Sequence, residues 1–515
     1  MDFRDLSRYN IYGNYIREKN MANFEKNTSS QGLFLSIQLD EQFSPDSREY
    51  ILKEFVQEHV KVDDFEEAYN NDHSGRKVKN PQDIVAAILY GYITGNRSSR
   101  KIEELLKTHI GFMFISNCLK IDHSIICEFK VKFSEQIKNV FSNMLFLMNE
   151  LEMIDWSLVV GDGTKIKAYA SRGQNIGKGF THKILKTYHK MADKIVERDI
   201  EIEKKFEEGE IDIKEHDAEK KRISRQKRKY EKTISKINAC LADEEMSKRL
   251  ETERINLTDP DSSLTLASSR TGYIQGYNAV LMVSNNDVIL NVEPITNKES
   301  EHTEEMVHRV EELKKDAGTD KESTYLFDNG FQNMENTLKL EDEGLNMYID
   351  ARTNDFSEKS EKRTNFQVIK SDNDYMLKCR NNREVKGRQY KNSSDYNFIF
   401  DRKRCEGCTF KSDCYKNSKD TTKHKRVIYS ELEVKDRDKI DKYLNKLRSE
   451  EGQKIYSKRF GKEHVNSNIK GQRNFLQTFY RGKTLVGMDL YWVAFAHNIR
   501  RYISFISKKE EWKAV

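Results

Sequence analysis

Four side chains near the C-terminus have the types and the spacing needed to act on a phosphodiester. Tyr456 is followed by Arg459, Glu463 and Lys470, at offsets that place all four on one face of a single helix. Such a carboxylate can hold a catalytic metal ion, and the two cations can hold the phosphates of a nucleic-acid strand. An ordinary exposed ion pair fits equally well, because Arg459 and Glu463 are four residues apart.

Two aspartates elsewhere in the chain could complete a metal site. Asp162 lies between two glycines in a β-branched run over 157–168, which predicts a buried strand where an aspartate is disfavoured unless it has a role. Asp328 ends another apolar run and is followed by a helix and a strand at 346–349. This β-α-β order predicts a parallel pair with Asp328 at the carboxyl end of its strand, although Asp328 could simply cap the next helix.

Three carboxylates brought together would repel one another unless cations neutralised them. Two Mg²⁺ or Mn²⁺ ions, roughly 3.5–4 Å apart, would do so; one would activate water or a 3′-hydroxyl and the other would stabilise the leaving oxygen. Asp162, Asp328 and Glu463 are therefore the candidate catalytic and metal-binding residues.

A second metal is predicted in a polar segment, residues 355–425, that we expect to be irregular. Cys405 and Cys408 have the spacing of a zinc knuckle, and Cys414 and Cys379 would complete a tetrahedral structural zinc site. His424 could replace one of these ligands. The alternative is that the four cysteines are reduced structural thiols.

Residues 1–150 read as helical, with helix starts at Asn80-Pro81 and Asp122 and a second amphipathic helix continuing through Ile137. Three cations lie near another helix start: Arg97, Arg100 and Lys101. The region is either a plain helical domain or a helix-turn-helix-like DNA reader with these cations on phosphates.

Composition excludes several classes of protein. Charged residues make up 34% of the 515 residues, yet the net charge is only +5, so basic surfaces must be local. The N-terminus does not resemble a signal peptide, and no apolar run approaches the roughly 20 residues of a membrane span. We therefore expect a soluble, cytoplasmic protein that associates with the nucleoid when it acts, with no membrane partner and no disulfide framework.

The middle of the chain alternates between helix and strand patterns. Over 181–255, two apolar stripes separated by Glu208-Gly209-Glu210 predict a helical hairpin. Strand patterns resume at 271–283 and 288–292, with a turn at Asn285-Asn286-Asp287 between them.

The Y-x2-R-x3-E-x6-K spacing resembles the signature of bacterial insertion-sequence transposases with a DDE catalytic triad. The Asp-Gly-Thr-Lys-Ile segment around Asp162 is similar to the surroundings of that family's first aspartate, and the Ser-Ser-Arg-Lys-Ile-Glu and Asp-His-Ser segments resemble its N-terminal domain. The chain departs from the family at Ile121, Ser284 and Asp489, where relatives tend to have proline, aspartate and glutamate.

The resemblance implies an α/β fold: an RNase H-like mixed-sheet catalytic domain with a helical N-terminal domain and two insertions. The N-terminal DNA-binding and dimerisation domain would span 1–150. The catalytic domain would comprise three segments, with the helical hairpin inserted after the first and the cysteine-rich insertion after the second. In chain order these parts are 151–180, 181–255, 256–355, 356–424 and 425–505.

The resemblance also implies an activity. The protein would cut and join the ends of an insertion sequence on double-stranded DNA, as a homodimer in the DNA complex. Its phosphate contacts would come from Tyr456, Arg459, Lys470 and Arg473. Two alternatives remain open: a catalytically inactive transposase-derived DNA-binding protein, and an RNase H-like nuclease without strand transfer.

Overall fold

A computed structural model describes residues 38–513, except 67, 70–76, 178–179, 269–270, 296–297, 352–360, 372–373, 391–392 and 415–423. The first 37 residues of the predicted N-terminal domain thus lie outside the described part. The chain forms two compact units. One comprises Met1–Met144 with Ile499–Val515, and the other comprises Leu145–Asn498.

The described part of the first unit is helical, as the sequence predicts. Its main helices are α1 (Arg48–His59), α3 (Pro81–Ile93), α4 (Ser99–Thr108), α5 (Ile110–Ile115), α6 (His123–Lys132) and α7 (Ser134–Glu150). Two predicted starts are confirmed: the Asn80 side chain accepts the Gln82 N–H before α3, and Asp122 accepts two backbone N–H groups before α6.

One predicted helix of this unit is in fact two. The amphipathic pattern through Ile137 predicts continuity, but α6 ends at Lys132 and α7 begins at Ser134. Phe133 leaves helical geometry and packs its ring 5.2 Å from that of Phe65. Burial of this aromatic ring competes with helix continuity, and periodicity cannot show such a tertiary contact.

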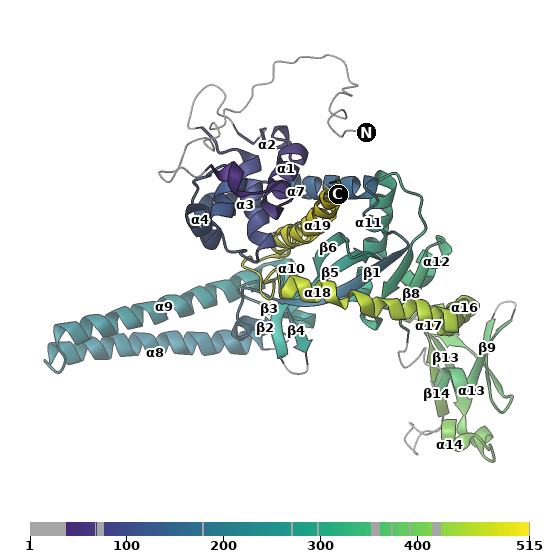
Figure 1. The fold of residues 1–515 in the computed structure, drawn as a ribbon. Helices are drawn as coiled ribbons and strands as arrows, with labels where there is room; N and C mark the ends of the chain where they lie inside the picture. The colour runs from purple at the N-terminus through teal and green to yellow at the C-terminus, as the bar shows by residue number, and fades with distance from the viewer. Residues whose placement is uncertain are drawn as a thin grey trace. The chain divides into compact units, whose positions relative to one another are not determined.

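The second unit is built on a six-stranded mixed sheet with the order β4-β5-β1-β7-β8, in which β6 also pairs with β5 (Figure 1). The central strand β1 (Leu158–Lys167) is antiparallel to β5 (Gly272–Ser284) and parallel to β7 (Thr324–Phe327). The remaining strands are β4 (Ser263–Ser268), β6 (Ile289–Ile295) and β8 (Asn346–Ile349). This arrangement is compatible with an RNase H-like domain.

The predicted strands and the β-α-β unit are confirmed. After β7 the chain forms α12 (Met334–Asp342), capped by Asn333, and returns as β8 parallel to β7. Gly161 on β1 leaves space for a side chain of β7: a Cβ at this position would overlap the buried ring of Phe327.

Several helices pack against the strands of the sheet. Helix α19 (Lys483–Lys513) begins in this unit, and its residues up to Asn498 belong to it. The Asn498 side chain bonds both the N–H and the carbonyl of Ile289, at 2.9 and 2.8 Å, so the helix is fixed to β6. Helices α11 (Thr303–Asp316) and α12 also pack on strands of the sheet. Among the described residues, no helix is both long and apolar enough to cross a bilayer.

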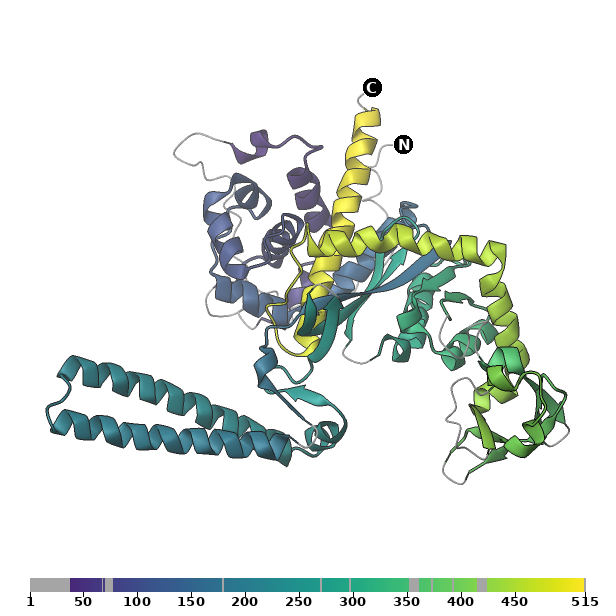
Figure 2. The same ribbon diagram turned by 90° about the horizontal axis from the view of Figure 1, so that it is seen from below.

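Two long helices, α8 (Thr181–Glu207) and α9 (Ile213–Ala242), lie side by side in both ribbon views (Figures 1 and 2). They are antiparallel, because Asp199 pairs with Lys220 at 2.7 Å while the rings of Tyr188 and Tyr230 lie 5.9 Å apart. The turn between them contains Gly209 at φ +74°, a conformation that favours glycine.

The described part of the cysteine-rich region is not irregular, contrary to our prediction. It forms two small antiparallel sheets: β9 (Phe366–Ser371), β10 (Asp374–Cys379) and β11 (Glu384–Lys386), then β12 (Arg388–Gln389), β13 (Tyr396–Asp401) and β14 (His424–Tyr429). Phe398 and Phe400 are buried while Ile399 between them is exposed. Ile399 is apolar although exposed, and so is Ile428 on β14, so the alternation of buried and exposed residues does not appear in the sequence as an alternation of apolar and polar residues.

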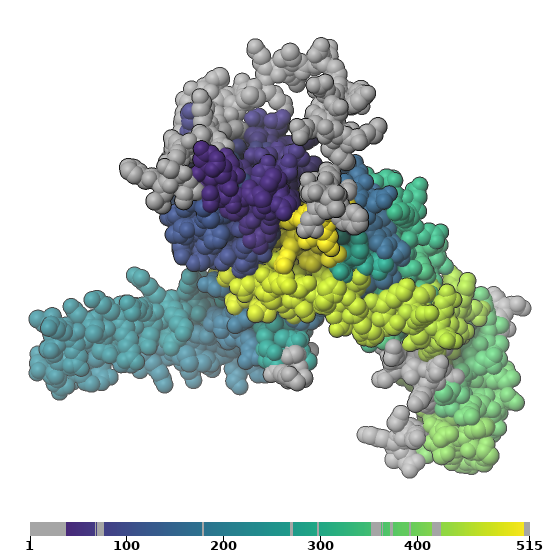
Figure 3. All heavy atoms as spheres, in the orientation of Figure 1, coloured from purple at the N-terminus to yellow at the C-terminus, as the bar shows by residue number. Residues whose placement is uncertain are grey.

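The signature segment is also not one continuous helix. It consists of α17 (Glu450–Ser457), a 3₁₀ segment η7 (Lys458–Lys462) and α18 (Glu463–Lys470). A 3₁₀ turn holds about three residues, so residues after it no longer face the direction that an α-helix would give them. In the space-filling view the α16–α18 segment, in yellow-green, lies at the surface; α16 is Arg437–Arg448 (Figure 3).

Candidate active site

Asp162 and Asp328 occupy adjacent positions on two neighbouring strands. Gly161 pairs with Phe327 in the parallel register of β1 and β7, and each aspartate is the next residue along its own chain segment. Residues in parallel register point to the same side of a sheet. The structure therefore brings these two predicted carboxylates together.

The surroundings of both aspartates favour their neutral form. Burial is the largest cause that raises the pKa of Asp162, and Arg459 opposes it while Asp328 adds to it. Burial likewise raises the pKa of Asp328, with a further rise from Glu299 and an opposing effect from Arg459. A cation at this position would stabilise both charges.

Arg459 is the cation that faces the pair. Its Nη1 lies 3.9 Å from Oδ1 of Asp162 and its Nη2 lies 4.0 Å from Oε1 of Glu463, and its side chain is only 12% exposed. From α18, Asn466 donates its Nδ2 to Oδ2 of Asp162 at 2.7 Å. The signature segment thus contacts β1 through two side chains.

Glu463 stands on the other side of the Arg459 guanidinium and is 59% exposed. Within the described ranges, no three His, Cys, Asp or Glu side chains are grouped so that they could hold a metal ion. Arg459 contacts both Glu463 and Asp162, but Glu463 is not positioned with the aspartates as a third metal ligand.

Two further signature residues face the same place. Tyr456 is 4% exposed, its ring lies 5.9 Å from the Arg459 guanidinium carbon, and burial raises its pKa. Burial lowers the pKa of Lys470, and the negative charge of Asp162 opposes that change. Lys470 is therefore close enough to Asp162 for their charges to interact.

The other predicted DNA contacts differ in exposure. Arg473 and Arg97 are only 2% and 3% exposed, and Arg97 in the first unit lies 5.9 Å over the ring of Tyr92. These two guanidinium groups could reach a phosphate only after a rearrangement. Arg100 and Lys101 are exposed at the start of α4.

A fourth carboxylate, Glu299, belongs to the site and was not expected from the sequence. Its Oε1 accepts a bond from Lys165 Nζ at 3.0 Å and another from the Asn278 amide. A Cβ at Gly163 would lie 2.6 Å from Glu299 Oε1, and one at Gly330 would overlap its Oε2. The glycines after both aspartates signal close approach, but the sequence could not say of which residue.

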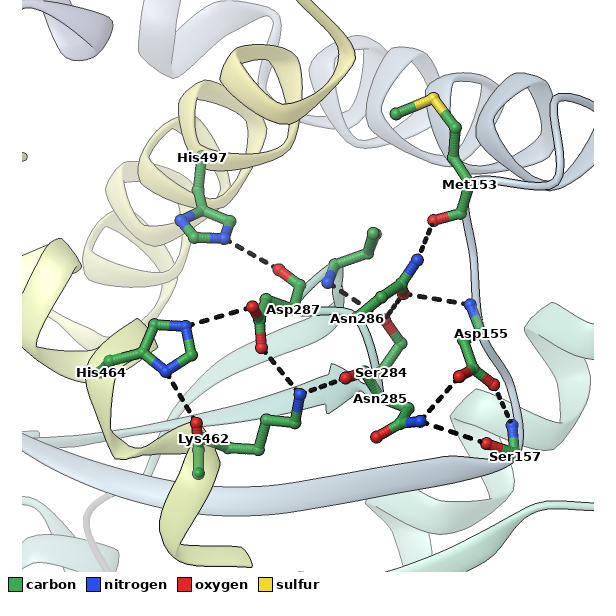
Figure 4. Close-up of polar contacts among 12 residues, drawn as sticks. Met153, Asp155, Ser157, Ser284, Asn285, Asn286, Asp287, Lys462, His464 and His497 are labelled. Carbon is green, nitrogen blue, oxygen red and sulfur yellow. Dashed lines mark hydrogen bonds and ion pairs between the residues drawn. The ribbon is translucent and has the colours of Figure 1, made fainter. Parts of the chain in front are cut away.

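Asp287, in the turn between β5 and β6, holds both chain neighbours of Glu463 (Figure 4). Its Oδ1 accepts a bond from Lys462 Nζ at 2.8 Å, and its Oδ2 lies 3.1 Å from Nε2 of His464. The Asp287 carbonyl also lies 2.9 Å from Nε2 of His497. The backbone on each side of Glu463 is therefore anchored to one carboxylate.

The four predicted zinc ligands line one pocket. Cys379, Cys405, Cys408 and Cys414 all contribute to it, together with cationic side chains that include Arg380 and Lys425. In the part of the chain that the structure describes, these thiols are not grouped as metal ligands would be. Zinc binding stays a prediction.

Comparison with known protein families adds two observations. Residues 376–503 match a family described as "Transposase DDE domain", and residues 37–132 match one described as "Transposase domain (DUF772)". Both families are described as transposase domains, and each match covers less than half of the chain. Comparison with curated proteins and with solved structures gave no match.

The two matches contain only some of the candidate site residues. The first contains the cysteine-rich sheets from β10 onward and all of α16 to α18, and therefore Glu463. The second contains α1 to α6 of the first unit. Asp162 and Asp328 lie outside both, so their assignment depends on the sheet geometry.

Proposed function

We propose that this chain cuts and joins the ends of an insertion sequence, with Asp162, Asp328 and Glu463 as its catalytic carboxylates. The observation that carries the proposal is the adjacent placement of Asp162 and Asp328 on β1 and β7, opposite Arg459 from the signature segment. The transposase matches supply the substrate class, which is double-stranded DNA.

The donor set suits divalent cations that prefer oxygen. Two half-buried carboxylates with raised pKa values lie side by side, and a bound cation would remove the cost of ionising both. When bound between Asp162, Asp328 and Glu463, Mg²⁺ or Mn²⁺ ions would supply Lewis acidity and an activated oxygen nucleophile. Glu463 must turn its exposed side chain toward the aspartates to take part.

Cations of the signature segment would then serve the DNA. In the metal-free chain Arg459 partly neutralises Asp162, and occupation of the site by metal would free its guanidinium for a phosphate oxygen. Lys470 would contact the same strand, and the Tyr456 hydroxyl, whose side chain is only 4% exposed, would do so after a local rearrangement. We assign the segment from Tyr456 to Lys470 to the transposon end nearest the cut.

The proposed domains follow the predicted boundaries. Residues 1–150 would bind DNA through exposed cations such as Arg100 and Lys101 and would contribute to a homodimer in the DNA complex. Residues 356–424 would bind structural zinc through their four cysteines. Metal analysis of the purified protein tests the latter: about one zinc per chain is expected, and a folded sample without zinc would reject the site.

A strand-transfer assay tests the proposed function against its alternatives. The probe is DNA that carries the inverted repeats flanking the coding region, already cut to expose the 3′-hydroxyl, with supercoiled plasmid as target. We expect Mg²⁺-dependent joining by the wild-type chain and none by Glu463→Gln. Nicking without joining would indicate a nuclease, and binding without either reaction would indicate an inactive DNA-binding protein.

A further inference from the structure

A cavity of about 930 Å³ opens on the second unit beyond the end of β1. It is lined by the end of β1 and the loop after it, by the start of β5 and by the loop that follows α18. Three of the lining side chains are cationic and exposed, namely Lys167, Arg172 and Arg481, and none of the lining residues is acidic. This concentration of positive charge is notable in a chain whose net charge is only +5.

Two exposed aromatic rings accompany these cations. Tyr169 is 51% exposed and Tyr273 is 56% exposed, although both belong to the lining of the cavity. Arg481 donates its Nε to the Tyr169 carbonyl at 3.0 Å and lies 5.0 Å over the same ring. Arg172 donates to the Tyr273 carbonyl at 2.6 Å. Backbone acceptors thus hold both guanidinium groups at the cavity, and that of Arg481 also lies over the Tyr169 ring.

We propose that this cavity binds an unpaired stretch of DNA strand, with phosphates on the cations and bases on the two tyrosine rings. Exposed rings beside cations are the features by which proteins bind single strands, because every base has a face that can stack. A paired duplex would contact the cations through its phosphates, but its bases would not be free to stack on the rings. The inference rests on the proposed function, since it assigns part of the DNA substrate to a second site.

The sheet sets the distance between this site and the aspartates. Lys167 follows Asp162 by five residues on β1, which corresponds to roughly 16 Å along an extended strand. The end of β1 is fixed, because the Lys167 N–H donates to Leu476 and its carbonyl accepts from Thr478, both at 3.0 Å. With B-form DNA between the two sites, at 3.4 Å per nucleotide, the unpaired stretch would begin about five nucleotides from the cut.

The test uses the full chain in EDTA, so that binding is measured without cleavage. The probes are a mixed-sequence single-stranded oligonucleotide and the blunt duplex of the same sequence. We expect Tyr169→Ala and Tyr273→Ala each to weaken single-strand binding by about 5- to 150-fold, the effect of losing one stacked base, with duplex binding unchanged.

Tyr390→Ala is the matched control for this pair. Tyr390 is 51% exposed and has Arg426 5.5 Å over its ring, but it does not line the cavity. The control should bind both probes as the wild type does. If the cavity variants bind the single strand as tightly as the control, or if the wild type does not bind it, the proposal is overturned.

Salt dependence gives a second readout. The double variant Lys167→Gln/Arg481→Gln should make the slope of log K against log salt shallower by about 0.7 per cation on single-stranded DNA. The exposed pair Lys315→Gln/Lys321→Gln should leave the slope unchanged. Equal weakening of both probes by the cation variants, with no effect of the tyrosine variants, would mean that the cavity binds a duplex backbone and would also overturn the proposal.

These outcomes are independent of catalysis. A chain that does not cleave DNA but shows the tyrosine effect would refute the proposed function and leave the single-strand site standing. A chain that cleaves normally and shows no tyrosine effect would refute the single-strand site alone.

Discussion

Asp162 is half-buried next to a second carboxylate, so its charge destabilises the metal-free fold. Burial is the main cause that raises its pKa above the ordinary value. Arg459 lowers the pKa and Asp328 raises it further. For an acid whose folded pKa is raised, stability is lost as pH rises from the ordinary value of 3.8 through the folded value. Arg459 offsets this cost only in part, so a bound metal cation would stabilise the ionised Asp162 at neutral pH.

The variant Asp162→Asn should expose this cost. We expect it to melt higher than the wild type at pH 7 in EDTA, by about 2–4 °C, and the gain should shrink as the pH falls and the wild-type carboxyl takes up its proton. Thermal unfolding followed by circular dichroism measures it. Asp342→Asn, at an exposed pair with Lys439, should show no such gain. A constant difference between Asp162→Asn and wild type at every pH would contradict the electrostatic cause.

Asp287 should matter through Glu463 and not through DNA binding. Asp287 has φ +67°, so Asp287→Gly keeps the turn and removes both the Lys462 and the His464 contacts. We expect the Mg²⁺ concentration for half-maximal cleavage to rise about 10- to 100-fold, as when a residue that orients a metal ligand is lost. DNA affinity in EDTA should not change.

Two further variants define the specificity of this effect. Asp287→Asn should recover part of the metal affinity, because asparagine tolerates the same backbone and can still accept a bond from Lys462. Glu343→Gln removes a comparable pair with His308, at 2.7 Å, and should behave as wild type. An unchanged Mg²⁺ requirement in Asp287→Gly would show that the contacts do not position Glu463.

At the scale of elements, the sequence predicts the sheet well because its strands are local apolar runs with clear ends. The run before Asp328, the Asn333 cap and the strand at 346–349 specify β7, α12 and β8 without any distant contact. The break at η7 and the split at Phe133 depend on tertiary packing, which periodicity does not record. The small sheets around the cysteines have short strands with exposed apolar residues such as Ile399 and Ile428, so their sequence lacks a clear alternation of apolar and polar residues.

The packing of the Phe327 ring of β7 against Gly161 of β1 gives a prediction about stability. Gly161→Ala should place a methyl group in the Phe327 ring and destabilise the protein by about 1–3 kcal/mol or more. Urea unfolding measures the change. Gly173→Ala is the control, because its nearest atom would be Ser171 Oγ at 3.7 Å, an ordinary contact. Equal stability of the two variants would mean that the Phe327 ring can move aside without cost.

At the scale of the whole molecule, the candidate site is a product of topology. Asp162, Asp328 and Glu463 are far apart in the chain, and the order β1, β7 and α18 is what brings their segments together. The sequence could nominate the three residues by their local patterns and by a family resemblance. It could not reveal Glu299, the anchoring by Asp287, or the present position of Glu463 beyond Arg459, since these depend on side-chain contacts across elements.

The most direct test of the central claim is single-turnover cleavage of DNA carrying the flanking inverted repeats. It compares the wild-type chain with Asp162→Asn, Asp328→Asn and Glu463→Gln at saturating Mg²⁺. We expect wild-type cleavage, a loss of at least about 100-fold in each variant, and unchanged DNA binding in EDTA. Cleavage by the three variants at the wild-type rate would contradict the assignment of these carboxylates as the catalytic site.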